Sequence, residues 1–132
     1  MAVLVDSNVL LDILAPDPVW SAVSSAALQD ALDSGRVIIN LVIYAEVSVG
    51  YDSMELANDA IPTALDREII PYEAAFLAGK AFAKYRRRGG TRRSPLPDFF
   101  IGAHAAVGGY RLLTRDPTPY RTYFPSVPLI AP

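Results

Sequence analysis

Residues 3–12 read Val-Leu-Val-Asp-Ser-Asn-Val-Leu-Leu-Asp, and this stretch carries most of the information on the fold. A short apolar run ends at a polar turn, a pattern that predicts a buried strand over residues 2–6. The polar turn, Asp6-Ser7-Asn8, can cap a helix over residues 9–14. The chain therefore begins with a strand that passes directly into a helix.

Further along the chain, short apolar segments alternate with helical patterns. The expected strands are residues 37–39, 68–70, 110–114 and 127–131, and the expected helices are residues 19–34, 53–65, 72–88 and 98–107. Residues 41–49 are ambiguous, because their β-branched residues favour a strand whereas Asn40 could cap a helix there. The alternation indicates an α/β layer structure around a parallel sheet.

Length and composition predict a single domain over residues 1–132. The chain is 52% hydrophobic, which is enough for a proper core, and it has no cysteine. The absence of cysteine excludes disulfides, zinc–thiolate sites and cysteine nucleophiles, and it fits a reducing compartment. No signal peptide is recognisable and no apolar run is long enough to span a bilayer. We therefore expect a cytoplasmic protein that does not bind membranes.

Five arginines fall within eight residues although the net charge is −2. They are Arg86, Arg87, Arg88, Arg92 and Arg93. A polyanion such as RNA could bind there despite the overall sign of the charge. The same cluster could equally be a solvated helix end, because cations favour helix C-termini.

Four acidic residues lie at the ends of predicted strands, at the start of a predicted helix or within an apolar stretch. Asp6 and Asp116 follow predicted strands, Asp98 begins a predicted helix, and Glu46 interrupts an apolar stretch. Ligands of open parallel sheets bind beyond the carboxyl ends of the strands, where Asp6 and Asp116 are expected. Taken singly, Asp6 and Asp98 could be helix caps, and Asp116 could be a turn residue. Glu46 is costly to bury unless it is paired or bound to a cation, and its bland alternative is exposure on an outer helix face.

If the fold gathers these four carboxylates, they form a strongly negative pocket. Like charges close together disfavour ionisation, and a bound divalent cation reverses that effect. A set of ligands made only of oxygen atoms suits Mg²⁺ or Mn²⁺ rather than zinc. Such ions activate water and stabilise charge at a phosphate in phosphodiester cleavage. The acids thus point to metal-dependent chemistry on a phosphate ester.

Other catalytic machinery is not recognisable in the sequence. There is no phosphate-binding glycine loop and no serine nucleophile elbow. His104, the only histidine, lies six residues after Asp98 and therefore on a different helix face, so we expect it to be structural. The aromatic group Tyr120, Tyr123 and Phe124 is expected to pack in the core or at its edge.

Four segments together resemble PIN-domain ribonucleases. They are residues 3–12, residues 44–46, residues 97–105 and residues 112–116, and they occur in the order expected for that family. The ending Tyr-Arg-Thr-Tyr-Phe-Pro, residues 120–125, is typical of the VapC toxins of toxin–antitoxin pairs. Any one of these motifs is weak, but the ordered set is fairly specific and covers nearly the whole chain.

The resemblance implies a fold and an activity. The fold is a three-layer α/β/α sandwich with a mostly parallel five-stranded sheet, in which residues 41–49 form a helix. The activity is that of an endoribonuclease dependent on Mg²⁺ or Mn²⁺. Asp6, Glu46, Asp98 and Asp116 match the four acidic positions of the family, and Asp6 and Asp98 would be the main metal ligands. Thr114 matches the small hydroxyl residue that often supports the site, and Ser7 and Asn8 flank the first aspartate, Asp6.

The resemblance also implies partners. A VapB-like antitoxin would wrap the toxin and place an arginine near the acids, which requires an exposed apolar groove. The chain would act on RNA, which the arginines of residues 86–93 could guide, and it would form a homodimer. Two other functions stay open: a non-catalytic interaction module in which the acids are caps, and a metal-independent carboxylate-pair hydrolase acting on glycosides.

Overall fold

Five parallel strands form a sheet in the order β3-β2-β1-β4-β5 in the computed structural model, which describes residues 1–92 and 96–132. The strands are β1 (Val3–Val5), β2 (Val37–Ile39), β3 (Asp66–Arg67), β4 (Arg111–Leu113) and β5 (Leu129–Ile130). Because all of the pairs are parallel, every strand ends at the same edge of the sheet. The first strand occupies the centre, between β2 and β4.

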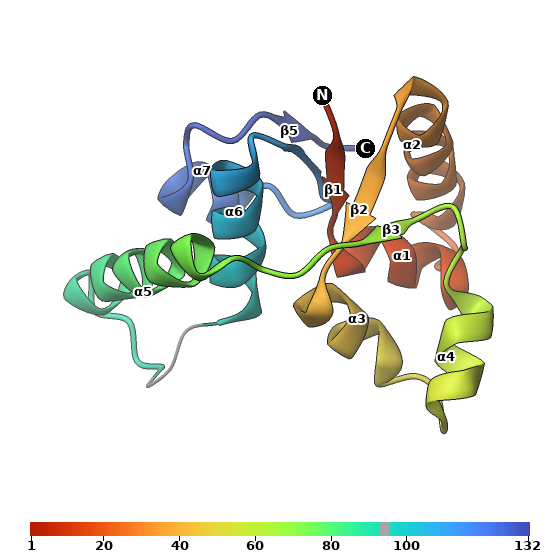
Figure 1. The fold of residues 1–132 in the computed structure, drawn as a ribbon, viewed down its shortest axis with the longest axis horizontal. Coiled ribbons are helices and arrows are strands. Elements are labelled where there is room, and N and C mark those ends of the chain that lie inside the picture. The colour runs from red at the N-terminus through yellow and green to blue at the C-terminus, as the bar shows by residue number, and fades with distance from the viewer. Residues whose placement is uncertain (93–95) are drawn as a thin grey trace.

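Helices cover both faces of the sheet, and this confirms the expected α/β/α sandwich. They are α1 (Ser7–Leu14), α2 (Ser21–Ser34), α3 (Leu41–Ser48), α4 (Met54–Ala60), α5 (Tyr72–Arg87), α6 (Pro97–Gly108) and α7 (Thr118–Tyr123). In Figure 1, α5 and α6 lie on one side of β1 and β2, and α1 and α2 lie on the other. No helix in the described part of the chain is long and apolar enough to cross a lipid bilayer.

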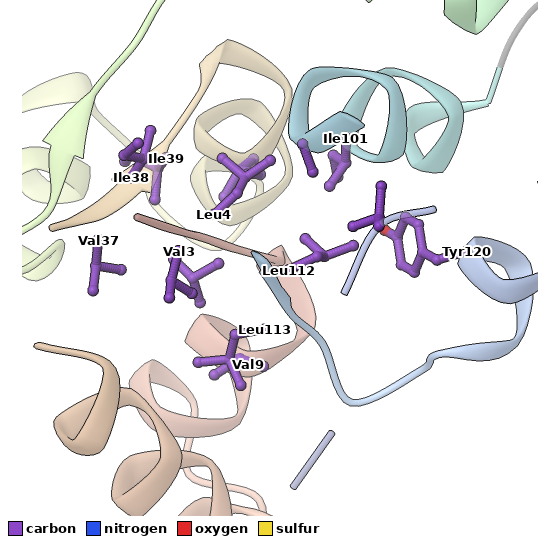
Figure 2. Close-up of a cluster of buried hydrophobic side chains, with 14 of the residues drawn as sticks. Val3, Leu4, Val9, Val37, Ile38, Ile39, Ile101, Leu112, Leu113 and Tyr120 are labelled. Atoms are coloured by element: carbon purple, nitrogen blue, oxygen red, sulfur yellow. The ribbon is translucent and has the colours of Figure 1, made fainter. Parts of the chain in front are cut away.

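Strands β1 and β2 are buried on both faces, as their uninterrupted apolar sequences predict, and in β4 the two leucines that follow Arg111 are buried as well. Figure 2 shows Leu4 and Leu112 on the side of Ile101 and Tyr120, whereas Val3 and Leu113 lie on the side of Val9. Neighbouring residues of one strand thus point to opposite helical layers. Both layers are thereby fixed relative to the ends of β1 and β4.

Residues 41–48 form helix α3, as the resemblance predicts and against their β-propensity. The side-chain oxygen of Asn40 accepts hydrogen bonds from the backbone N–H groups of Val42 and Ile43, both at 3.0 Å. These bonds satisfy two of the donors that a helix start leaves free. One cap therefore turns an ambiguous apolar stretch into a helix, which brings Glu46 to the end of the sheet.

Two expectations about the elements were wrong, and one helix was missed. The third strand is residues 66–67 rather than 68–70, because the pairing with β2 aligns Ile38 with Asp66 and leaves the side chain of Ile69 in solvent. The helix expected over residues 53–65 ends at Ala60, before Pro62, whose ring does not fit a helix interior. Helix α7 was not expected.

Helix α6 is closely packed on the segment that follows β4. A side chain at Gly102 would come within 2.3 Å of the Phe124 ring, so only glycine permits this approach. The helix ends at Gly108 and is capped by Gly109, whose φ of 70° is left-handed and favours glycine. The close contact sets the distance between the beginning of α6, which carries Asp98, and helix α7.

Candidate functional site

The ends of β1 and β4 place Asp6 next to Thr114, which stands two residues before Asp116. Asp6 directly follows β1, and its backbone N–H donates to the carbonyl oxygen of Leu113 at 2.8 Å. Thr114 directly follows β4 and leads into Asp116. Because β1 and β4 are paired neighbours, residues about 110 positions apart meet at one edge of the sheet. This is the edge at which parallel sheets bind ligands.

Asp6 is almost fully buried and strongly hydrogen-bonded. Its Oδ2 atom accepts bonds from the hydroxyl groups of Tyr120 at 2.8 Å and Thr114 at 2.9 Å, and from the side-chain amide of Asn8 at 3.3 Å. Its side chain does not cap α1, although Asp6 occupies the cap position. The interpretation of Asp6 as a simple helix cap therefore does not hold, and its carboxylate faces the ends of the strands.

Glu46 is brought next to Asp6 by helix α3. The hydroxyl group of Ser7 donates to Oε1 of Glu46 at 2.9 Å and lies 3.4 Å from Oδ1 of Asp6. Glu46 is half-buried, so it does not lie on an outer helix face. Ser7 thus links two of the four acids.

Asp98 lies in the first turn of α6, where the helix dipole favours an acid. The hydroxyl group of Tyr120 lies 3.3 Å from Oδ1 of Asp98 and 2.8 Å from Oδ2 of Asp6. A single buried hydroxyl group therefore stands between two carboxylates that are far apart in the sequence, Asp6 and Asp98.

The protonation of these acids reflects both burial and mutual repulsion. Burial, followed by the negative charges of Asp6 and Glu46, raises the pKa of Asp98 to about 6. Burial raises the pKa of Asp6, against the hydrogen bonds from Tyr120 and Thr114. Burial and the charge of Asp6 also raise the pKa of Glu46. Burial and the two neighbouring carboxylates raise the pKa of Tyr120 well above its usual range, so it stays a hydroxyl group.

Asp116 is the outermost of the four acids. It is exposed, and its backbone N–H donates to the hydroxyl oxygen of Thr114 at 3.1 Å. Its charge contributes to the raised pKa of Asp98, after the charges of Asp6 and Glu46. Asn8 fixes the same turn, because its side-chain oxygen accepts from the backbone N–H of Arg115 at 3.1 Å.

The donor atoms fit a hard divalent cation in kind. The four side chains offer carboxylate oxygens alone, which suit Mg²⁺ or Mn²⁺. Within residues 1–92 and 96–132, none of the four forms an ion pair with a lysine or arginine. In the same ranges, no three carboxylate, histidine or cysteine side chains stand close enough together to enclose an ion as they are. The arrangement is thus an uncompensated acidic cluster rather than a closed coordination shell.

The arginine cluster lies at the far end of α5. Arg86, Arg87, Arg88 and Arg92 are exposed, and Arg93 lies outside the described residues. Arg86 donates to the backbone carbonyl of Arg92 at 2.5 Å. The guanidinium group of Arg88 lies 5.5 Å from the centre of the Tyr123 ring on α7, close enough for a cation–π contact. A cleft lies between α5, α6 and α7, and its lining consists of Tyr85, Leu96, Asp98, Phe99, Pro119, Tyr123 and Phe124.

His104 is a structural residue, in agreement with the expectation. It is fully buried and lies 3.0 Å from both the amide nitrogen of Asn40 and Oε1 of Glu68. Neither partner belongs to the acidic cluster.

Tyr120 is the residue of the site that the sequence did not reveal. Its role depends on contacts with Asp6 and Asp98, which only the tertiary fold creates. The available signal was indirect: prolines at 117 and 119 favour the first turn of a helix, which would have predicted α7 just behind Asp116.

Solved structures with a similar fold include chains of toxin–antitoxin complexes. A chain of VapBC2 from Rickettsia felis superposes with a TM-score of 0.77 at 15% identity, over 99% of this chain and 98% of that chain. A chain of DNA-bound VapBC from Salmonella typhimurium gives 0.73 at 18% identity, over 99% and 98% of the two chains. A toxin–antitoxin complex from Klebsiella pneumoniae gives 0.63 at 21% identity, over 98% and 96%. At these identities the likeness shows the fold.

The sequence itself gives the family. No curated protein matches the chain. The family model described as the PIN domain matches residues 3–125, which include Asp6, Asp98, Asp116 and Tyr120. Since this match spans nearly the whole chain, the protein belongs to the PIN domain family.

Proposed function

We propose that this chain is a metal-dependent endoribonuclease, the toxin of a VapBC-like toxin–antitoxin pair. The observation that carries the proposal is the uncompensated cluster of Asp6, Glu46 and Asp98, in which each carboxyl group has a raised pKa. A buried cluster of this kind is costly unless a cation neutralises it. The family membership and the toxin–antitoxin complexes with the same fold support this interpretation.

Asp6 and Asp98 would hold the cation, and Glu46 and Asp116 would complete its surroundings. Bound there, Mg²⁺ or Mn²⁺ would activate water and stabilise the charge on the phosphate being cleaved. The chain's own hydroxyl groups keep the acids in place. Thr114 holds Asp6, and Ser7 holds Glu46. The loss of any of these groups should weaken the site without unfolding the sheet.

RNA is the substrate that the charge distribution favours. The exposed arginines of α5 and the loop behind it offer positive charge on a protein of net charge −2. Helix α5, at whose end these arginines lie, borders the cleft that Asp98 lines. Arg88 also contacts Tyr123, a residue of the same cleft. Phosphate groups of a single strand could bind there while one phosphodiester reaches the acids. The sequence of the RNA target is left open.

A protein partner is favoured by an exposed apolar face beside α3 and α5. Ile69 is 79% exposed and Tyr72 is 92% exposed. The exposed side chain of Leu41 lines two hollows, one together with Ile69 and the other together with Tyr72. We propose that a VapB-like antitoxin covers this face, which would supply the apolar groove that such wrapping requires. A homodimer and a cytoplasmic location stay predictions. To test this surface, the chain is co-expressed with the product of an adjoining small reading frame, and the partner is sought by copurification. The Ile69→Asp variant should lose the partner, whereas the control variant Asp59→Asn should keep it.

The catalytic part is tested with purified, metal-free protein. Wild-type protein should cleave RNA with Mg²⁺ or Mn²⁺ and stop with EDTA, and calorimetry should show a Mn²⁺ site. Asp98→Asn and Asp6→Asn should lose both cleavage and the site, whereas Asp59→Asn, an exposed acid on α4, should keep both.

Two outcomes would favour the alternatives. Full hydrolytic activity in EDTA, on a glycoside rather than RNA, would support a carboxylate-pair hydrolase. A folded protein that binds neither Mn²⁺ nor Mg²⁺ would support a non-catalytic interaction module. RNA cleavage that survives both aspartate substitutions would show that the site lies elsewhere.

A further inference from the structure

We infer that Tyr120 is a positioning residue of the acidic site: its buried hydroxyl group holds one oxygen of Asp6 so that the other oxygen stays available for a cation. This inference rests on the proposed metal-dependent function and assigns a role to a residue outside the four acids. It starts from an asymmetry between the two oxygens of Asp6.

The two carboxylate oxygens of Asp6 have different surroundings. Oδ2 accepts three hydrogen bonds, from Tyr120 at 2.8 Å, Thr114 at 2.9 Å and Asn8 at 3.3 Å. Oδ1 lies 3.4 Å from the hydroxyl group of Ser7, which makes its shorter bond, 2.9 Å, to Glu46. Among residues 1–92 and 96–132, Ser7 is also the residue whose backbone N–H lies near the Asp6 carboxylate, and no donor from another element reaches Oδ1. A carboxylate oxygen that carries three donors has little capacity left for a metal ion. Oδ1 is therefore the oxygen that can bind one.

The hydroxyl group of Tyr120 is not needed to fill space. Tyr120 is only 1% exposed, and its ring packs among apolar side chains such as Leu112 and Ile101 (Figure 2). Phe124, one turn later, is also buried in this region without any hydroxyl group. A buried hydroxyl group is costly unless it is hydrogen-bonded, and the bonds that this one makes go to Asp6 and Asp98. Its presence is explained by the carboxylates.

A tyrosine hydroxyl group has one proton and can donate to one acceptor at a time. The contact with Asp6 at 2.8 Å is the better hydrogen bond, and the contact with Asp98 at 3.3 Å is long for a bond between oxygens. Asp98 can therefore turn towards a cation without breaking the bond that holds Asp6. Tyr120 thus fixes one ligand and leaves the second free to move.

The test compares Tyr120→Phe with Tyr123→Phe. Both variants lose one hydroxyl group on helix α7, but only Tyr120 contacts the acids; Tyr123 packs on the Phe99 ring. Calorimetric titration of the metal-free proteins with Mn²⁺ should show affinity about 10–100-fold weaker for Tyr120→Phe, the usual effect of losing a group that orients a metal ligand. Tyr123→Phe should bind as the wild type does.

A merely structural role would lower the melting temperature of Tyr120→Phe but leave its Mn²⁺ affinity unchanged, and that result would overturn the inference. A second measurement needs no variant. In protein with ¹³C-labelled tyrosine, the Cζ signal of Tyr120 should move when Mg²⁺ binds, while that of the exposed Tyr72 stays. Bound Mg²⁺ without any tyrosine shift would also overturn it.

The failure of this inference can be told apart from the failure of the proposed function. If the wild type binds Mn²⁺ and cleaves RNA while Tyr120→Phe binds Mn²⁺ as tightly, only the role of Tyr120 is wrong. If the wild type binds neither Mn²⁺ nor Mg²⁺, both are wrong.

Discussion

The side chain of Asn40 caps helix α3 with its oxygen and binds the buried ring of His104 with its nitrogen, 3.0 Å from Nδ1. Because the oxygen is used by two backbone N–H groups, the amide nitrogen must face the ring. Nδ1 of His104 is then an acceptor, and the proton lies on Nε2, which donates to Glu68 at 3.0 Å. One residue thus joins the helix that carries Glu46 to the helix that carries Asp98.

This arrangement predicts the tautomer of His104. A long-range ¹H–¹⁵N spectrum should show a single neutral imidazole, since the chain has one histidine, with its proton on Nε2. Addition of Mg²⁺ should not change it, because His104 does not touch the acids. A ring that carries its proton on Nδ1 would show that the amide of Asn40 is turned around.

Asn40→Ala should destabilise the protein by about 2–4 kcal/mol. The variant loses a helix cap, worth about 0.5–2 kcal/mol, and leaves a buried ring nitrogen without a donor, which costs about 1–3 kcal/mol. Urea unfolding measures the change. Ser53→Ala is the matched control, because Ser53 caps the exposed helix α4 and has no buried partner. Equal losses in both variants would contradict the coupling to His104.

The metal-free protein should become more stable as the pH falls from 7 towards 4. The pKa of Asp98 is about 6 in the folded protein against 3.8 for the unperturbed group, so the folded state binds the proton more tightly than the unfolded chain. This stabilisation is complete below about pH 4 and is lost as the pH rises through 6. Thermal melts between pH 4 and 8 measure it.

Asp98→Asn should flatten this dependence and raise the melting temperature of the metal-free protein at pH 7, because it removes a repelled, partly buried charge. Asp59→Asn should change neither. With saturating Mn²⁺ the trend in the wild type should reverse, since protons and the metal compete for the same oxygens. A wild-type protein that loses stability steadily below pH 6 without metal would refute the assignment of a raised pKa.

Arg115→Met should destabilise the protein by roughly 2–4 kcal/mol, because removing one partner leaves a buried charge without compensation. Arg115 donates to the buried carboxylate of Asp12 at 2.8 Å, and Ser24 donates to the same oxygen at 2.7 Å. Combining Arg115→Met with Asp12→Asn should recover most of the loss in urea unfolding. Losses that simply add would show that the two residues are independent.

Glutamine at Arg86 and Arg87 should weaken RNA binding in EDTA and make it less dependent on salt. Each lost phosphate contact should lower the slope of log affinity against log salt by about 0.7 for a single strand. Lys80→Gln, on the same helix α5, is the control, since Lys80 lies over the Phe76 ring. An unchanged slope would assign these arginines to a solvated helix end.

The parts of the fold that the sequence predicted are those with strong local patterns. Strands β1 and β2 are continuous apolar runs, β4 is a pair of leucines after Arg111, and α5 and α6 have regular helical spacing with clear ends. The third strand was misplaced because it is a polar edge strand, Asp66 and Arg67, and the side chain of the nearby apolar residue Ile69 faces solvent. Edge strands need little apolar sequence, so hydrophobic pattern does not find them.

The acids of the site were predicted as residues, but their environment was not. Whether Asp6 caps a helix or receives Tyr120 depends on contacts between residues 114 positions apart, which no local pattern encodes. Helix α3 was predicted only through the family resemblance, because β-branched residues favour a strand there. The assignment of the four acids as metal ligands stays a prediction.

A ribosome that has made the first hundred residues has not yet made the neighbour that the central strand needs. Strand β1 is the first strand to be synthesised, but its partner β4 ends at residue 113 and Tyr120 follows later still. Until then, one side of β1 is unpaired and Asp6 lacks both Thr114 and Tyr120. During synthesis the chain therefore holds an unfinished site, and the acidic cluster can take up its folded geometry only after Tyr120 has left the ribosome.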